Sequence, residues 1–252
     1  MLNNIAIFAT FLLGALGASS QQGGLAGLRT IRASSVNWSG VVIQGQNISS
    51  VSGTFPVLEP GIPNVNETGK HAYSASVWIG IDGYNKTICP DGGLWQAGVL
   101  TQHHNLTGEI WYQPFYELYP DPPVFLDIGN STAGDMMKVS LDVASVNQAS
   151  VVLENLTTGR AFNQIVNITH PLCMSSAEWI VERAYSISGL IGLLDFGTET
   201  INELSYTLGG QVYTSLSDDI TILDIVNDEL NNTVQTSTDV TQTSINVTYI
   251  GS

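Results

Sequence analysis

Short runs of β-forming residues occupy most of this chain, and no long helical pattern interrupts them. The runs are rich in Val, Ile, Thr, Tyr and Trp and are separated by Gly, Asn, Asp and Pro, a pattern typical of strands joined by turns. Strands are expected at 40–43, 74–81, 109–112, 138–143, 150–154, 161–165, 178–182, 211–214, 220–225 and 244–250. Strands with this spacing predict an all-β sandwich of two antiparallel sheets.

The chain divides into a leader, a short connecting segment and one domain. Residues 5–18 are apolar, too short to span a bilayer comfortably, and followed by small residues near position 19, which predicts a signal peptide over 1–19 and an exported, extracellular protein. Residues 20–35 are expected to be a mobile segment or a short propeptide. The remaining length, 36–252, suits a single large β domain.

The charge balance is strongly acidic, with 7 Lys+Arg against 22 Asp+Glu and a formal net charge of −15. Such a chain is a poor partner for nucleic acid and for anionic membrane surfaces. Protonation of carboxylates in acid reduces the self-repulsion, so the composition suits an acidic medium. Acidity that serves solubility alone would give the same balance.

Asn-X-Ser/Thr sequons are dense, which independently indicates export. A sequon at Asn37 lies inside a motif expected to be buried, and it is not counted as a glycosylation candidate. The glycosylation candidates are Asn47, Asn66, Asn85, Asn105, Asn130, Asn155, Asn167, Asn231 and Asn246.

The chain has two cysteines, Cys89 and Cys173. In an oxidising compartment an even pair predicts one disulfide. The bridge would hold the segment that contains Gln96 near the segment that contains Glu182.

Several common catalytic signatures are missing from the sequence. It has no Gly-X-Ser-X-Gly elbow, no His-Glu-X-X-His, no phosphate-binding glycine loop and no Asp-Thr/Ser-Gly pair. The four histidines lack metal-ligand spacing. No metal and no organic cofactor is therefore expected.

Two polar residues lie in apolar, strand-like segments, where an unsatisfied polar side chain costs free energy. They are Gln96 in Leu-Trp-Gln-Ala-Gly and Glu182 at the end of Ala-Glu-Trp-Ile-Val-Glu. In a strand, Glu178 and Glu182 share a face, and period alone does not choose between them.

Five motifs together resemble the glutamic peptidase (eqolisin) family, a group of secreted, acid-acting fungal endopeptidases, and the resemblance covers about residues 36 to 183. The motifs are Asn-Trp-Ser-Gly (37–40), Trp-Ile-Gly-Ile-Asp-Gly (78–83), Leu-Trp-Gln-Ala-Gly (94–98), Phe-Tyr-Glu-Leu-Tyr-Pro (115–120) and Ala-Glu-Trp-Ile-Val-Glu (177–182). The resemblance implies a jelly-roll-like sandwich related to concanavalin-like lectins and glucanases.

The resemblance also implies a catalytic pair, with Glu182 rather than Glu178 as general base and acid and Gln96 positioning the water and the oxyanion. An ionised Glu182 would need hydrogen bonds that support its charge in acid. Residues expected to bind substrate or support the pair are Trp38, Trp78, Asp82, Glu117 and Tyr119. Leu100, Phe115 and Leu118 depart from the family pattern, which is expected to affect subsite preference more than the reaction.

The resulting prediction is a monomeric acid endopeptidase that acts on proteins or peptides. An alternative keeps the fold and assigns a carbohydrate-binding or glycoside-hydrolysing protein, with aromatic residues stacking on sugars and Glu117 and Glu182 as paired carboxylates. An inactive family member that only binds is the third alternative.

Overall fold

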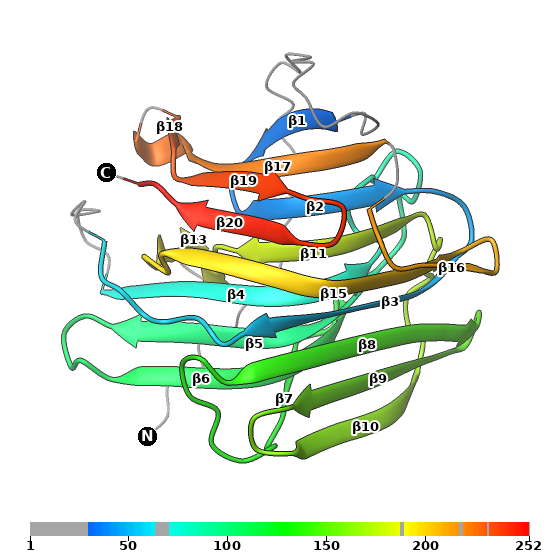
Figure 1. Cartoon of the computed structure of the whole chain (residues 1–252), viewed down its shortest axis with the longest axis horizontal. Coiled ribbons are helices and arrows are strands. Elements are labelled where there is room, and N and C mark those ends of the chain that lie inside the picture. The colour runs from blue at the N-terminus through cyan, green and yellow to red at the C-terminus, as the bar shows by residue number, and fades with distance from the viewer. Residues whose placement is uncertain (1–29, 64–70, 187–188, 217–218, 231, 252) are drawn as a thin grey trace.

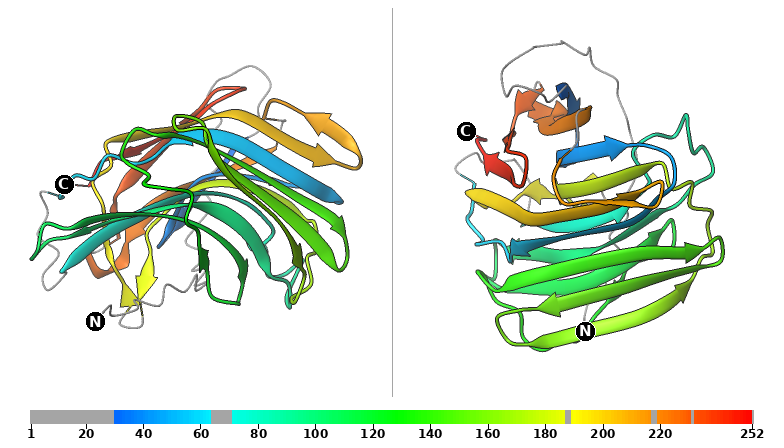
Figure 2. Two further views of the ribbon diagram at one scale, coloured as in Figure 1. Left: turned by 90° about the horizontal axis from the view of Figure 1, so that it is seen from below. Right: turned by 45° about the vertical axis from the view of Figure 1, so that its right-hand side comes forward.

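Two large β-sheets stacked face to face make up the protein, as the sequence predicts (Figure 1). The computed structural model describes residues 30–63, 71–186, 189–216, 219–230 and 232–251. Figure 2 shows that both sheets are curved and that one lies over the other. The strand pairs are antiparallel apart from β1 with β17 and β14 with β4.

The first sheet holds the strands that carry the polar residues noted in the sequence. In spatial order its strands are β1 (Thr30–Ser35), β17 (Ile220–Asn227), β2 (Trp38–Gln44), β11 (Ser176–Glu182), β4 (Ala72–Ile81), β5 (Leu94–His104), β6 (Ile110–Tyr119) and β7 (Val124–Phe125). Two short strands extend it, β14 (Gly192–Leu193) beside β4 and β18 (Thr233–Val234) beside β17.

The second sheet covers one face of the first. Its strands, in order, are β10 (Arg160–Asn167), β9 (Gln148–Asn155), β8 (Met136–Ser145), β3 (Ile48–Pro56), β15 (Thr198–Leu208), β20 (Ile245–Tyr249) and β19 (Thr236–Val240), with β16 (Gln211–Tyr213) beside β15. A two-stranded hairpin of β12 (Tyr185–Ser186) and β13 (Gly189–Leu190) and a 3₁₀ turn, η1 (Asp228–Leu230), complete the described elements.

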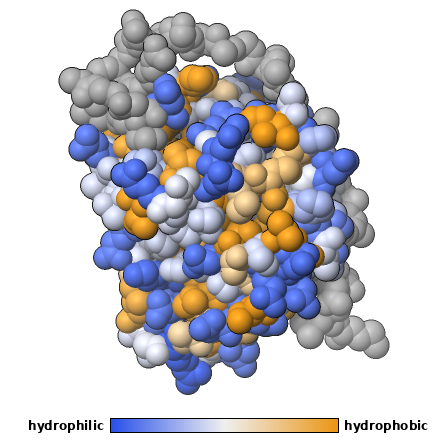
Figure 3. Space-filling view, turned by 90° about the vertical axis from the view of Figure 1, so that its right-hand side faces the viewer, coloured by the Kyte–Doolittle hydropathy of each residue, from blue (hydrophilic) through white to orange (hydrophobic). Residues whose placement is uncertain are grey.

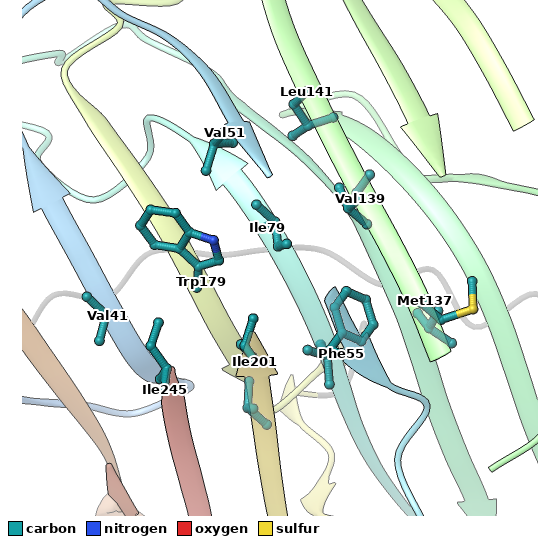
Figure 4. Packing of buried hydrophobic residues seen from close by; sticks show 14 of the residues in the cluster. Val41, Val51, Phe55, Ile79, Met137, Val139, Leu141, Trp179, Ile201 and Ile245 are labelled. Atoms are coloured by element: carbon teal, nitrogen blue, oxygen red, sulfur yellow. The ribbon is translucent and has the colours of Figure 1, made fainter. Parts of the chain in front are cut away.

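The main core lies between the two sheets, because alternate residues of each strand point into it. From the first sheet, Ile79 and Trp179 are fully buried there, and from the second sheet Phe55 and Val139 face them (Figure 4). The Trp179 indole Nε1 donates to the Ser52 carbonyl at 2.9 Å, which satisfies its one polar atom across the sandwich.

The central strands of the first sheet are buried on their other face too. A second cluster there includes Trp38, Trp78, Leu100, Phe115 and Ile180. Because both faces of these strands are buried, their sequences are apolar at most positions. A polar side chain on this second face is removed from water.

The start of the domain differs from the expectation. Residues 30–35, expected to be part of a mobile segment, instead form β1 in parallel register with β17. Arg32 fixes the strand, because its Nη1 lies 3.1 Å from Asp224 Oδ2 and its Nη2 donates to the Thr238 carbonyl. The expected signal peptide and residues 20–29 lie outside the described residues, and within the described part no helix is long and apolar enough to cross a membrane.

The predicted disulfide between Cys89 and Cys173 is confirmed, with Cα atoms 6.0 Å apart. It joins the loop before β5 to the loop before β11. The strands of Gln96 and Glu182 thus begin from covalently linked loops.

Candidate active site

The polar residues noted in the sequence gather on the second face of the first sheet. Gln96 on β5, Glu117 on β6 and Glu182 on β11 project from the face opposite the main core. Gln96 pairs directly with Glu117, and β4 lies between the strands of Gln96 and Glu182. All three side chains line one small hollow.

The rest of this hollow is mainly apolar, and a glycine beside it lets two strands approach closely. Gly98 lies between Trp78 and Phe115 in the cross-strand row. A Cβ atom at Gly98 would lie 2.0 Å from the Val77 carbonyl oxygen, so only glycine fits where β4 and β5 approach here. The other lining residues are Ser76, Leu100, Phe115, Pro123, Phe125 and Ala184.

Glu182 is buried and hydrogen-bonded through both carboxyl oxygens. Asn37 Nδ2 donates to Oε1 at 3.0 Å, and Trp78 Nε1 donates to Oε2 at 2.7 Å. Burial raises the pKa of Glu182 to about 7, because it outweighs the hydrogen bonds from Trp78, Trp38 and Asn37 that lower it. The expected hydrogen bonds to Glu182 are present and favour its charged form, but burial has the larger effect, so the carboxyl is protonated below this pKa.

Gln96 is held by Glu117, which the sequence placed near the catalytic pair. Gln96 Nε2 donates to Glu117 Oε2 at 2.6 Å, and both residues are buried. Burial and the negative charge of Glu182 raise the pKa of Glu117 to about 8, against the hydrogen bond from Gln96. The two carboxyl groups therefore affect one another through the same small hollow, and both are neutral in acid.

The Gln96 side chain keeps one strong acceptor uncommitted. Its Oε1 is buried and has no hydrogen-bond partner among the described residues. A buried amide oxygen is expected to find a donor, because an unmade hydrogen bond costs about 1 to 3 kcal/mol. The Oε1 atom is therefore available to accept a hydrogen bond from a water or a ligand group.

The other residues expected near the site lie at different distances from the hollow. Trp38 and Trp78 pack edge to face at 4.9 Å beside Glu182, and both are buried. Asp82 does not line the hollow, and its carboxylate instead accepts from the backbone N–H groups of Met174 and Ser175, which fixes the approach to β11. Tyr119 lies at the edge of the cluster with its ring 5.8 Å from Lys86 Nζ.

Asn37 is the site residue that sequence reasoning missed. The sequence marked it only as a sequon in a buried motif, whereas the structure aims its amide at Glu182. Its position in the chain could have indicated this role. Asn37 directly precedes Trp38, and Trp38 pairs with Glu182 where β2 and β11 lie side by side. A glycan on this amide would displace the hydrogen bond to Glu182.

The sequons differ in exposure. Asn47, Asn105, Asn130 and Asn167 are exposed, and Asn85 and Asn246 are half-buried. Asn155 is 1% exposed and its Nδ2 donates to Asp135 Oδ2, so this candidate is corrected, because a glycan has no room there. The candidates Asn66 and Asn231 lie outside the described residues.

Two further glutamates are buried away from the hollow. Glu178 is fully buried, and burial raises its pKa well above the usual range, with the charge of Asp82 acting in the same direction and the Ser176 hydroxyl against it. Glu199 on β15 is 2% exposed, and burial likewise raises its pKa. Neither has a salt bridge to a cation among the described residues. The fold therefore encloses several carboxyl groups that are stable there only as neutral acids.

Carboxyl, amide and hydroxyl side chains supply the polar groups of the hollow, and no group of three metal-ligating side chains occurs in the described part of the chain. A buried carboxyl next to an amide with a free acceptor can position a water and exchange protons with it. The arrangement suits hydrolysis by a water molecule.

Comparisons with known proteins point to the same chemistry. A sequence model of the Peptidase A4 family matches residues 36–249. Aspergillopepsin-2 of Aspergillus niger is 34% identical over 232 residues, which is 86% of this chain and 78% of the relative. The crystal structure of aspergilloglutamic peptidase from Aspergillus niger superposes with a TM-score of 0.62 and 34% identity, covering 71% of this chain and 99% of that one.

A second solved structure supports the fold alone. Scytalido-glutamic peptidase with a transition state analog inhibitor matches with a TM-score of 0.70 at 23% identity, over 85% of this chain and 98% of that chain. The sandwich described above is therefore shared with this peptidase.

The buried carboxyls predict a protein that loses stability as pH rises. A carboxyl with a raised folded-state pKa binds its proton more tightly in the folded state, so the free energy of unfolding falls between the unfolded pKa, 4.5, and the folded values of about 7 and 8. We expect a loss of at least about 3 kcal/mol over this range. Urea unfolding at a series of pH values measures it.

The double variant Glu178→Gln, Glu199→Gln keeps the shape of both side chains and removes two of the buried ionisable carboxyl groups. It is expected to unfold at higher urea concentration than wild type at neutral pH and to differ little at about pH 4. A variant with wild-type pH dependence would contradict the assignment.

Proposed function

The chain belongs to the Peptidase A4 family and is a glutamic endopeptidase, and we propose that Glu182 and Gln96 are the pair with which it hydrolyses peptide bonds. The observation that carries the proposal is the shared hollow, which the buried residues Glu182 and Gln96 both line, together with the Gln96 Oε1 atom that has no hydrogen-bond partner among the described residues. The reaction needs no cofactor, since water is the second substrate.

In acid, Glu182 enters the reaction as a neutral carboxylic acid. One oxygen gives its proton to the scissile carbonyl oxygen while the other takes a proton from the attacking water, so a gem-diol forms and Glu182 ends protonated again. In the second step Glu182 gives a proton to the leaving nitrogen, the C–N bond breaks, and one diol hydroxyl returns its proton to Glu182. The products are a carboxylic acid and an amine, and the protons balance.

Gln96 positions the reacting water and stabilises the developing oxygen charge. Its Oε1 accepts a hydrogen bond from the water, and its Nε2, which gives one hydrogen to Glu117, has a second hydrogen for the substrate oxygen. An amide does this work without a change of protonation. By accepting a hydrogen bond from Nε2, Glu117 fixes which end of the Gln96 amide faces the Glu182 carboxyl.

Asn37 and Trp78 hold the Glu182 carboxyl at both oxygens. They act as positioning residues, because they bind Glu182 rather than the substrate. Both donors also favour the carboxylate form, which limits how far burial raises the pKa.

The substrates are proteins or peptides, and the proposed setting is an acidic extracellular medium. The apolar run at 5–18, the sequons with exposed asparagines and the disulfide support export and glycosylation. The raised pKa values of Glu117 and Glu182 support action in acid. Of the three residues that depart from the family pattern, Leu100 and Phe115 line the hollow and Leu118 faces the main core. We therefore expect Leu100 and Phe115, rather than Leu118, to affect subsite preference.

The carbohydrate alternative is weaker. Trp38 and Trp78 are buried, at 3% and 0% exposure, and have no free face for stacking on a sugar. Gln96 lies against Glu117 with its amide hydrogen-bonded to that carboxyl, which a pair of glycosidase carboxylates would not require.

Replacing Glu182 with Gln should abolish peptide cleavage and leave the fold intact, because an amide keeps the shape but shuttles no proton. General acid-base contributions are typically about 10²- to 10⁴-fold, and loss of the proton-carrying group should reach the upper end. The measurement is kcat/KM on a denatured protein and on a peptide, with circular dichroism as the check on folding.

Glu178→Gln is the matched control, since Glu178 lies four residues earlier on the same strand and does not line the hollow. It should retain most of the activity. Loss of activity in Glu178→Gln together with wild-type turnover in Glu182→Gln would show that the wrong glutamate was chosen.

Activity is expected to be high in acid and to fall as pH rises through about 7, where Glu182 loses its proton. Initial rates on a short peptide, measured from about pH 3 to pH 8 at times too short for unfolding, give the profile. Full activity persisting well above the pKa of Glu182 would contradict the neutral-acid mechanism.

A further inference from the structure

Exposed apolar side chains gather at the edge of the first sheet, next to the catalytic hollow. Ile110 and Trp111 at the start of β6 are 40% and 38% exposed, and Val124 and Phe125 of β7 are 44% and 43% exposed. Hydrophobic residues also reach the surface among hydrophilic ones on the face in Figure 3. A cluster of this kind points to an interaction surface.

These residues border a groove that is a neighbour of the catalytic hollow. Its walls include Trp111, Tyr112, Phe125 and Leu126. Phe125 lines both the groove and the catalytic hollow. The two spaces therefore meet at this one side chain.

Strand register gives the direction and the reach of the groove. Glu117, Phe115, Gln113 and Trp111 are alternate residues of β6 and project from the same face, where Trp111 pairs with Gln102. Six residues separate Trp111 from Glu117, which corresponds to roughly 20 Å along an extended strand. An extended peptide whose scissile bond lies in the catalytic hollow would reach Trp111 about six residues away.

The lining of the groove indicates what it would bind. Its polar members are neutral, among them Gln113, Asn130 and Thr132, and no charged side chain lines it. Apolar surface with neutral hydrogen-bonding groups suits an uncharged, extended polypeptide.

We propose that this groove, centred on Trp111, is a remote substrate-binding subsite that takes an apolar side chain of the polypeptide about five or six residues from the scissile bond. The inference rests on the proposed function, because it takes the hollow of Gln96 and Glu182 as the place of cleavage. It makes the enzyme favour long, unfolded chains over short peptides.

The test uses a quenched fluorescent core peptide that the enzyme cleaves, extended by six residues on either its N-terminal or its C-terminal side. Each tail carries only Gly and Ser, or carries Leu at its last two positions. N-glycans are removed enzymatically first, because Asn130 lines the groove. The readout is the ratio of kcat/KM for the Leu tail to that for the Gly/Ser tail.

In wild type we expect a ratio of roughly 5 to 10 for one of the two tail directions, mainly through KM, from partial burial of one or two apolar side chains. Trp111→Ser should bring this ratio to about 1, and Trp111→Phe should restore most of it. Val212→Ser is the control, since Val212 is 62% exposed on β16 of the other sheet, and it should keep the wild-type ratio.

The experiment distinguishes a failure of the proposed function from a failure of the proposed subsite. Wild-type enzyme that cleaves no peptide at any pH would overturn the proposed function. Wild-type enzyme that cleaves the core peptide but gives a ratio of 1 for both tail directions, or a Trp111→Ser variant with the wild-type ratio, would leave the proposed function standing and remove the subsite.

Discussion

The site depends on the burial of one carboxyl group in a sheet that is covered on both faces. Glu182 ends a strand whose neighbours supply an indole and an amide for its two oxygens, and apolar side chains exclude water around it. The hydrogen bonds hold the group in place, while burial decides its protonation by raising the pKa to about 7. This combination gives a carboxyl that is neutral in acid and fixed at both oxygens, as the proposed general acid and base requires.

The same constraint extends beyond the proposed catalytic group. Glu117, Glu178 and Glu199 are also buried, with pKa values raised by loss of hydration. With a formal net charge of −15, the chain already repels itself at neutral pH. An acidic medium neutralises both kinds of group, so the condition that keeps Glu182 protonated is also the one that stabilises the fold.

Much of the fold was readable from the sequence because β-forming runs and turn residues report local structure directly. Trp179 and Ile79 alternate into the core as the period of two requires. The strand at 30–35 was missed, since its pairing with β17 depends on a partner nearly 200 residues away and on the Arg32–Asp224 contact, which no local pattern reveals.

The site was predictable only in part. Family motifs predicted Gln96 and Glu182 as a pair, and both residues line one hollow. The protonation of Glu182 was not predictable, because it depends on the balance between burial and hydrogen bonds in the folded state. Asn37 was overlooked for a related reason, since a sequon and a buried positioning amide have the same local sequence and differ only in what the fold places opposite them.

The most direct test of this account is the protonation state of Glu182 itself. In protein labelled with ¹³C at glutamate side-chain carboxyls, the resonance missing from Glu182→Gln identifies this group, and its shift is followed from about pH 3 to pH 7. The account predicts that the carboxyl is still largely neutral at about pH 6 and titrates near 7. A midpoint near 4.5, the ordinary value, would contradict it.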